Sequence, residues 1–425
     1  MKKITSLLLT FLLVFTLAAG VQAQTVIDSK QEVKSVWLNE EKLELGNNSI
    51  YTENDVNYIP LRNVLEQLNY TVKWDSGNRA VIADKYGNVI NIQIGSNIGY
   101  VNDTPVELDV APKLVNGKTY ASLGSLTQLL SINVEWDSTT QALHLMQESS
   151  QGYFWKVEKD GVVVHILGSI HVGNDDMYPI RDEIEEAFYN ADNVAVEVNI
   201  LEMPDQQTLD KIVALQGYSD GKTLKDHVSA ETYERLQTFL ADLELPTDSY
   251  DEYKAWAVLL DINSYLAFLE SYQGGLGIDV YFLLKAMEQD KPILELESYL
   301  LQYSMFDSYS KELVESQINA ALDLVYSEGE AEGESTAVLS ELASLWIEGD
   351  DEGLEALIKA YEAESKEEYG KMILERHPQM IERIEGYLNN ADKESYFVIV
   401  GYLHTLGKDG LIALLKQKGY DVTRL

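Results

Sequence analysis

Two Gly-x-x-His units, each following an apolar run, constrain this chain more than any other feature. The first unit, residues 168–171, follows the run 162–167, and the second, residues 401–404, follows the run 396–400. Both runs are rich in β-branched or aromatic residues, which favours buried strands. A glycine lets the backbone turn sharply as it leaves a strand. The pattern therefore predicts two strands that each deliver a histidine at a rigid position.

A histidine at such a position can act as a metal ligand, a base or an acid. Either His171 or His404 alone could equally be a hydrogen-bonded structural residue, so it is their pairing that favours a functional site. A third group, Glu197, is the single charge in the apolar run 194–198 and needs a cation or hydrogen-bond donors. We expect these three side chains to meet at one end of a sheet. The two histidine-bearing strands must then run parallel and close together, with strand 194–198 beside one of them.

Composition limits the chemistry of such a site. The chain has no cysteine, so neither disulfides nor thiolate ligands are available, and any metal must be held by nitrogen and oxygen. Two imidazoles and a carboxylate suit manganese, iron, cobalt or zinc.

The formal net charge of −38 disfavours a nucleic-acid partner, because an acidic surface repels phosphate.

The first 23 residues have the features of a secretory signal peptide. Two lysines precede an apolar run from Leu7 to Ala19, and Val21-Gln22-Ala23 has the small-x-small form of a cleavage site. The apolar run is short for a membrane span, and no later stretch of about 18 uninterrupted apolar residues follows. We expect a secreted protein, extracellular or associated with the cell wall, whose mature chain has no transmembrane span.

Residues 33–146 contain an internal repeat. A short amphipathic helix is followed by a strand with tryptophan and a turn at Asp-Ser, first at Trp74 and again at Trp136, 62 residues later. The repeat predicts a small α+β domain. The polar stretch 147–152 reads as a linker, and a second domain follows at 153–425. At its start, Asp160-Gly161 between two apolar runs predicts a β-hairpin.

The repeat region resembles the copper amine oxidase N-terminal-like domain, a module common on secreted proteins of Gram-positive bacteria. The matching elements are Pro60-Leu61-Arg62 and the two Trp-Asp pairs, and the second copy has Ser122-Leu123-Gly124 in place of Pro-Leu-Arg. We expect no copper here, because His144 is the only histidine of this region. We expect the tryptophans in the core, with carbohydrate stacking as the alternative, and a role as a stalk for cell-wall attachment.

Residues 153–425 resemble the TraB/GumN family, to which the Tiki metalloproteases are related. The resemblance rests on the two Gly-x-x-His units, the Val-Glu-Val around Glu197, and Gly277-Ile278-Asp279 at a helix start. Further matches are Leu296-Glu297-Ser298 with Gln302, Trp346 with Gly349-Asp350, and Gly407, Gly410 and Gly419-Tyr420. Two positions depart from the family pattern. His377 follows Arg376 where asparagine is usual, which bears on a substrate contact, and Tyr402-Leu403 replaces a smaller pair, which would narrow the pocket.

The resemblance implies an α/β fold, a central mixed β-sheet with surrounding helices and one pocket at the strand ends. It also implies a divalent metal, manganese or cobalt, and hydrolysis of a peptide or protein substrate. His171, His404 and Glu197 would be both the catalytic and the metal-binding residues, with Glu197 as ligand or base. The remaining pocket residues expected are these: Gly168, Gly401, Asp279, Glu297, Arg376 and His377.

Two alternatives to a metal-dependent peptidase remain at this point. The related ChaN-like fold is associated with haem or iron, so the same histidines could belong to a non-enzymatic binding protein for peptide, haem or metal. The chain could also be a structural cell-surface protein, in which case His171 and His404 would lie apart or hold no metal.

Overall fold

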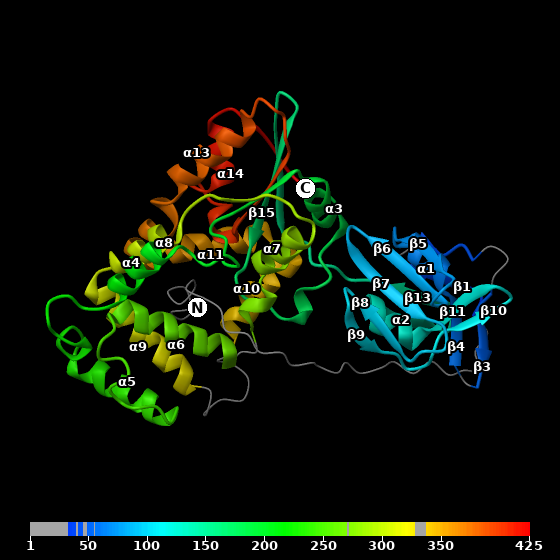
Figure 1. The fold of residues 1–425 in the computed structure, drawn as a ribbon, viewed down its shortest axis with the longest axis horizontal. Helices are drawn as coiled ribbons and strands as arrows, with labels where there is room; N and C mark the ends of the chain where they lie inside the picture. The colour runs from blue at the N-terminus through cyan, green and yellow to red at the C-terminus, as the bar shows by residue number, and fades with distance from the viewer. Residues whose placement is uncertain (1–32, 40, 46–48, 55, 270–271, 328–336) are drawn as a thin grey trace. The chain divides into compact units, whose positions relative to one another are not determined.

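The structure is a computed structural model that describes residues 33–39, 41–45, 49–54, 56–269, 272–327 and 337–425. The expected signal peptide, residues 1–23, lies outside the described residues. The chain divides into two compact units between Ser149 and Ser150, here called the N-terminal unit and the C-terminal unit. Each is described by itself (Figure 1). None of the helices in the described ranges combines the length and the apolar character needed to cross a bilayer.

The N-terminal unit is rich in β-structure, and its described residues form three sheets, in the strand orders β12-β13-β1-β2, β10-β11-β4-β3 and β5-β6-β7-β8-β9. Its elements are β1 (Ser35–Leu38), β2 (Glu41–Lys42), β3 (Tyr51–Glu53), β4 (Val56–Pro60), α1 (Leu61–Gln67), β5 (Thr71–Asp75), β6 (Ala80–Lys85), β7 (Asn88–Gln93), β8 (Ile98–Val101), β9 (Thr104–Glu107), β10 (Lys113–Val115), β11 (Lys118–Ser122), α2 (Leu123–Leu130), β12 (Asn133–Asp137) and β13 (Ala142–Met146).

The sequence repeat is also a repeat of structure. Helix α1 is followed by the hairpin β5–β6, and α2 is followed by the hairpin β12–β13, with matching elements starting 62 residues apart. The expectation that both tryptophans are core residues is wrong for Trp74, which is 40% exposed. Trp136 is half-buried and packs against the core of the unit. Each tryptophan lies on an edge strand, β5 or β12, which leaves one side of the strand unpaired, and Trp74 is the one that stays largely in solvent.

The C-terminal unit is built on one mixed sheet with the strand order β17-β16-β18-β15-β14-β19. Its strands are β14 (Tyr153–Lys159), β15 (Val162–Ser169), β16 (Asn193–Val196), β17 (Ile293–Glu295), β18 (Tyr396–Gly401) and β19 (Asp421–Arg424). Strands β17, β16, β18 and β15 are parallel, and β14 and β19 extend the sheet in antiparallel fashion. The mixed α/β fold expected from the sequence is confirmed. So is the hairpin β14–β15, whose turn residues Asp160 and Gly161 both have positive φ.

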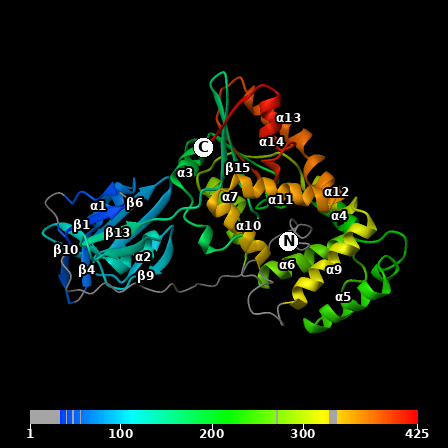
Figure 2. The ribbon, with the colours of Figure 1, turned by 180° about the vertical axis from the view of Figure 1, so that it is seen from behind.

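Helices surround this sheet (Figures 1 and 2). They are α3 (Asp182–Asn190), α4 (Gln206–Gln216), α5 (Ala230–Asp242), α6 (Ala255–Leu269), α7 (Ile278–Glu288), α8 (Tyr299–Asp307), α9 (Lys311–Ser327), α10 (Ala337–Glu348), α11 (Asp351–Glu364), α12 (Lys366–Tyr369), α13 (His377–Leu388) and α14 (Leu411–Gln417). A π-helical segment, Gly370–Leu374, joins α12 to the chain before α13. Helices α5, α6 and α9 lie side by side in both views.

An aromatic cluster fixes two of these helices on the sheet. Phe188 of α3 and Phe282 of α7 have ring centroids 4.9 Å apart, and both contact Phe397 of β18. All three rings are fully buried, which removes a large apolar area from water. Helix α7, which carries Asp279 in its first turn, is thereby held against the strand that leads to His404.

The stretch 147–152 is only partly a linker. Ser150 is buried and its hydroxyl donates to the Met177 carbonyl over 2.8 Å. The Gln151 and Gly152 amides donate to the carbonyls of Ile347 and Trp346. The C-terminal unit therefore begins at Ser150 rather than at 153, because these backbone groups find their partners within it.

Candidate active site

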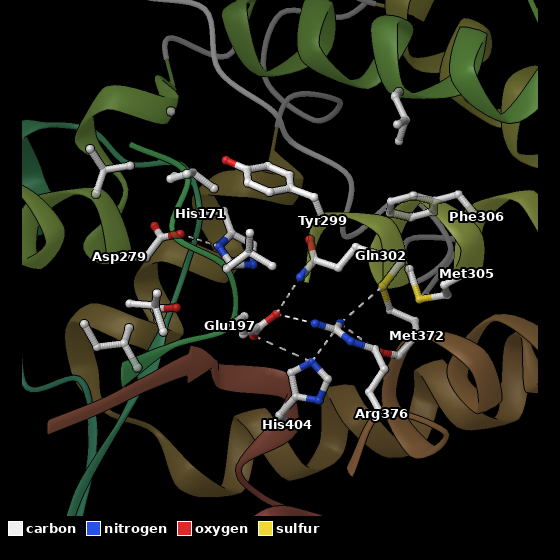
Figure 3. A pocket seen from close by; sticks show the side chains of 18 residues that line it. His171, Glu197, Asp279, Tyr299, Gln302, Met305, Phe306, Met372, Arg376 and His404 are labelled. Atoms are coloured by element: carbon white, nitrogen blue, oxygen red, sulfur yellow. Dashed lines mark hydrogen bonds and ion pairs between the residues drawn. The ribbon is translucent and has the colours of Figure 1, made fainter. Parts of the chain in front are cut away.

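Each of the four parallel strands ends at the same edge of the sheet and is followed by a polar side chain. His171 follows β15, His404 follows β18, Glu197 follows β16 and Glu297 follows β17, all within three residues of the strand end. Strands β15 and β18 are parallel neighbours, and β16 lies on the other side of β18. The expected direction and proximity of the histidine-bearing strands are confirmed. Four strand ends thus deliver two imidazoles and two carboxylates to one place; Figure 3 shows His171, His404 and Glu197 there.

Glu197 lies one residue beyond β16, not inside the strand as the sequence suggested, because β16 ends at Val196. Its side chain is buried, with the residue only 7% exposed. The Gly401 amide donates to Oε1 over 2.6 Å, and Arg376 donates to Oε2. Burial alone would raise the pKa of Glu197, but the charge of Arg376 and these hydrogen bonds lower it well below its ordinary value. Glu197 is therefore a carboxylate at neutral pH.

His171 is oriented by Asp279. Its Nδ1 lies 2.8 Å from Asp279 Oδ2, so this nitrogen carries the proton and donates it to the carboxylate. Burial opposes a charge on the ring, but Asp279 outweighs it and raises the pKa of His171 to about 9. The other nitrogen, Nε2, faces Gly401. A Cβ atom placed on this glycine would lie 3.7 Å from His171 Nε2 and 3.3 Å from Glu197 Oε1, so both groups border the same point.

Two glycines allow the β15 end to approach α7. A Cβ on Gly277 would lie 2.4 Å from the His171 carbonyl oxygen, and one on Gly173 would lie 2.1 Å from the Leu276 carbonyl oxygen. Both distances are shorter than a real contact, so only glycine fits at either position. Gly277 immediately precedes α7, and this close approach places Asp279 beside the His171 ring.

His404 is bound at both ring nitrogens. Its Nδ1 lies 3.0 Å from His377 Nε2, and its Nε2 lies 3.1 Å from Arg376 Nη1. Nδ1 of His377 lies 2.8 Å from the Asp409 carbonyl oxygen. Burial and the charge of Arg376 lower the pKa of His404 well below its ordinary value, and burial lowers the pKa of His377 to about 4. Both rings are therefore neutral at pH 7.

Arg376 is a buried cation at the centre of the cluster. Its guanidinium donates to both oxygens of Glu297, to Glu197 and to His404. Burial disfavours this charge, but the two carboxylates outweigh burial and raise the pKa of Arg376. Gln302 Nε2 donates to Glu297 over 3.2 Å and to Glu197 over 3.4 Å. The carboxylates are thus fully satisfied by protein donors, as buried charges require.

The donor set fits a divalent metal in kind. His171, His404 and Glu197 supply two imidazole nitrogens and a carboxylate beside one another, which is a ligand set for manganese, iron, cobalt or zinc. Within the described residues, however, no three histidine or acidic side chains are arranged as a metal-binding group. Arg376 donates to Nε2 of His404, so this nitrogen is not free to bind a metal in the structure. A metal at this site would require the guanidinium to move away from His404 and the His171 ring to lose its second proton.

A pocket opens beside these groups, lined at its polar end by His171, Glu197, Asp279, Arg376 and His404. Its remaining wall is mainly apolar, and Figure 3 shows the labelled members Tyr299, Met305 and Phe306, with Met372 beside Arg376. Met372 belongs to the π-helical segment, a feature often found at functional sites. The pocket therefore combines a charged end with an apolar wall, as expected for a site that binds an organic ligand.

The other residues expected in the pocket lie around it. Glu297 is buried behind Arg376, and His377 is buried behind His404, so neither lines the pocket. Gly168 packs against Tyr402 and Tyr153, because a Cβ there would lie 2.9 Å from Tyr402 Cβ. The expectation that Tyr402 narrows the pocket is wrong, because its ring packs on Tyr153 instead.

Sequence reasoning missed the apolar wall and the part played by Gln302. The wall comes from α8 and the segment 370–374, which contribute residues that look like ordinary helix core in the sequence. Gln302 was recognised as a family match only. Its spacing from Ser298, which caps the start of α8, could have placed it one turn into the helix, near the glutamate end of the sheet.

Comparisons with known proteins match both units of the chain. The sequence profile of the TraB/PrgY/gumN family matches residues 153–424, well over half of the chain. The chain belongs to the TraB/PrgY/gumN family. Residues 37–145 match the copper amine oxidase N-terminal domain, as the repeat suggested.

Curated relatives of this TraB/PrgY/gumN member are distant. "Uncharacterized protein YbaP" of Escherichia coli (strain K12) is 26% identical over 141 residues, 33% of this chain and 50% of the relative. This chain thus spans about half the length of YbaP. "Metalloprotease TIKI homolog" of Nematostella vectensis is 21% identical over 327 residues, which cover 65% of this chain and 67% of the relative.

Proposed function

We propose that this protein is a divalent-metal-dependent hydrolase that cleaves peptide bonds, with the metal held by His171, His404 and Glu197. The observation that carries the proposal is the state of the two histidines. In each ring Nδ1 is committed to a hydrogen bond with a neighbouring side chain, so Nε2 is the nitrogen that would bind a metal once His171 has lost its second proton and Arg376 has moved from His404. Metal-binding histidines are typically held in this way by a second group. A distant relative that carries the name metalloprotease supports the same reading.

The residues of the chain have separate tasks under this proposal. Asp279 holds the His171 ring, and His377 holds the His404 ring. Glu197 is ionised and serves as ligand or as general base. The apolar wall around Phe306 and Met305 takes up a substrate side chain and excludes water from the polar end. A bound divalent metal would polarise the substrate carbonyl and make a water molecule more acidic.

Secretion and attachment complete the proposal. The sequence features of residues 1–23 support export, and the N-terminal unit, with its partly exposed Trp74, supports a role in holding the enzyme at the cell wall. Peptide or protein substrates would then be met outside the cell.

Hydrolysis by the purified protein tests the proposal. A mixture of synthetic peptides is incubated with wild type and with the variants His171→Ala, His404→Ala and Glu197→Gln, with added Mn²⁺ or Co²⁺, and cleavage is followed by mass spectrometry. We expect metal-dependent cleavage by wild type and none by the three variants. The variant His144→Ala, in the N-terminal unit, is the matched control and should keep full activity. Cleavage that survives in His171→Ala or His404→Ala would contradict the proposed site.

A binding function without turnover is the second candidate, and Arg376 is the observation that favours it. A site whose acidic groups are already satisfied by an internal cation does not require a metal for its stability. Absorption spectra with added haem separate the candidates, because a haem-binding protein shows a Soret band and the proposed hydrolase does not.

A further inference from the structure

His377 holds a buried position directly behind His404. It is the first residue of α13 and is only 2% exposed. Arg376 and His377 are consecutive, yet they contact opposite nitrogens of the same ring, with Arg376 at Nε2 and His377 at Nδ1 of His404. The imidazole is therefore held between two neighbouring residues of one chain segment.

The two ends of this hydrogen-bond chain decide where the protons lie. The Asp409 carbonyl can only accept, so His377 Nδ1 must donate to it. Arg376 can only donate, so His404 Nε2 must accept from it. Between these ends, His404 Nδ1–H donates to His377 Nε2. Any other placement of the protons would bring two donors face to face at Arg376 or two acceptors face to face at Asp409.

We propose that His377 is a positioning residue that fixes the tautomer and the orientation of His404, so that the Nε2 lone pair of His404 always faces the site. His377 does not touch the substrate, because it does not line the pocket. It acts through His404 alone, as an acceptor anchored by a backbone carbonyl. The metal-binding part of this inference rests on the proposed function, and the tautomer part does not.

The tautomer can be observed directly in the wild-type protein. Long-range proton–nitrogen correlation spectra of the ¹⁵N-histidine-labelled chain distinguish protonated from bare ring nitrogens, and the chain has only six histidines. The His404 signals are identified by their loss in His404→Asn. We expect Nδ1 protonated and Nε2 bare at neutral pH. A proton on Nε2 of His404 would overturn the inference, whether or not the protein binds metal.

Two substitutions then separate positioning from simple structural support. In His377→Gln, the amide oxygen can accept from His404 and the amide nitrogen can donate to Asp409, so the direction of the chain is kept. In His377→Leu no acceptor remains. We expect His377→Gln to keep the wild-type tautomer and Mn²⁺ affinity, and His377→Leu to lose the single tautomer and to bind Mn²⁺ about 10- to 100-fold more weakly.

The outcomes differ for the two proposals. If His377→Leu melts earlier but keeps the His404 tautomer and the Mn²⁺ affinity, His377 is merely structural and the inference is wrong. Should that variant fail to fold, the wild-type spectrum and the affinity of His377→Gln still decide. If wild type binds no Mn²⁺ at all, the proposed function fails while the tautomer result stands on its own.

Discussion

At the scale of single residues, the most consequential feature is a buried arginine where a metal site was expected. Arg376 neutralises Glu197 and Glu297, whose side chains are both nearly inaccessible. Two carboxylates so close together would otherwise repel, and one would take up a proton. The arginine therefore explains how this acidic cluster is stable without a metal. It also sets a condition for metal binding, because the guanidinium must release His404 first.

Replacing Arg376 by methionine tests this internal cation. The change leaves two buried carboxylates without their partner, so we expect a loss of about 3–5 kcal/mol in the free energy of unfolding of the C-terminal unit, measured in urea. Added Mn²⁺ should raise the free energy of unfolding more in Arg376→Met than in wild type, because in the variant no guanidinium competes for His404. Lys418→Met, which breaks an exposed pair with Glu385, is the control and should cost at most about 1 kcal/mol. A loss in Arg376→Met no larger than in the control would refute this role.

His165 makes the stability of the fold depend on pH. It lies within β15 and stacks on Phe154, and burial lowers its pKa from 6.5 to about 4. In the window between these values the unfolded chain binds more protons than the folded one. The contribution of His165 to stability is thus complete above pH 6.5 and falls as the pH drops toward 4.

We expect His165→Phe, which keeps a ring in the stack, to remove the part of the pH dependence that is due to His165. Urea unfolding between pH 7 and 4 gives the slope of the unfolding free energy against pH, which reports the number of protons taken up on unfolding. This number should be smaller for His165→Phe than for wild type, by up to about one proton. Equal slopes for the two proteins would show that His165 does not titrate in this way.

At the scale of elements, the site is a product of parallel strand ends and of one helix start. Parallel neighbours point their carboxyl ends to the same edge, so residues from β15, β16, β17 and β18 meet although they are far apart in the sequence. Helix α7 approaches this edge through glycine, which lets Asp279 reach His171.

Gly277→Ala tests that approach. The new methyl group would lie 2.4 Å from the His171 carbonyl oxygen, so the strand end and α7 must separate. We expect a loss of about 1–3 kcal/mol in stability and a weaker affinity for Mn²⁺, measured by urea unfolding and calorimetry. Gly386→Ala is the matched control, because its methyl group meets nothing within 4 Å and it lies inside α13. The control should gain about 0.5–1 kcal/mol. An unchanged Mn²⁺ affinity in Gly277→Ala would contradict the role given to this contact.

Much of the site could be predicted from local sequence pattern, and the rest depended on distant packing. His171 and His404 were accessible because an apolar run followed by glycine and histidine describes a strand end. The same kind of argument placed Glu197 near the two histidines. The local pattern put it inside its strand, whereas it lies one residue beyond the strand end. The insertion of Arg376 between two glutamates was not accessible. It depends on how the segment before α13 returns to the sheet, which no periodicity in that segment encodes. His377 could be noticed as unusual, but its hydrogen bond to His404 requires the folded chain.

At the scale of the whole molecule, the chain consists of two units with separate cores. All residues that line the pocket belong to the C-terminal unit. The N-terminal unit is a duplicated helix-and-hairpin arrangement with a core of its own, which is what an independent module needs.

A fragment of residues 148–425 should therefore fold and keep the site. Its start must precede Ser150, because Ser150 and the next two residues bond to the C-terminal unit. We expect the fragment to unfold cooperatively and to bind Mn²⁺ with the affinity of the full chain. A fragment that folds but has lost all metal binding would show that the N-terminal unit contributes to the site.

Calorimetric titration of Mn²⁺ into the full chain tests whether His171, His404 and Glu197 form a metal site. We expect one ion bound per chain in wild type and in His144→Ala, whose altered residue stacks on Trp37 in the N-terminal unit. We expect no measurable binding in His171→Ala and in His404→Ala, because each change removes one nitrogen of the site. Unchanged Mn²⁺ binding in either of these two variants would contradict the assignment of His171, His404 and Glu197 as a metal site.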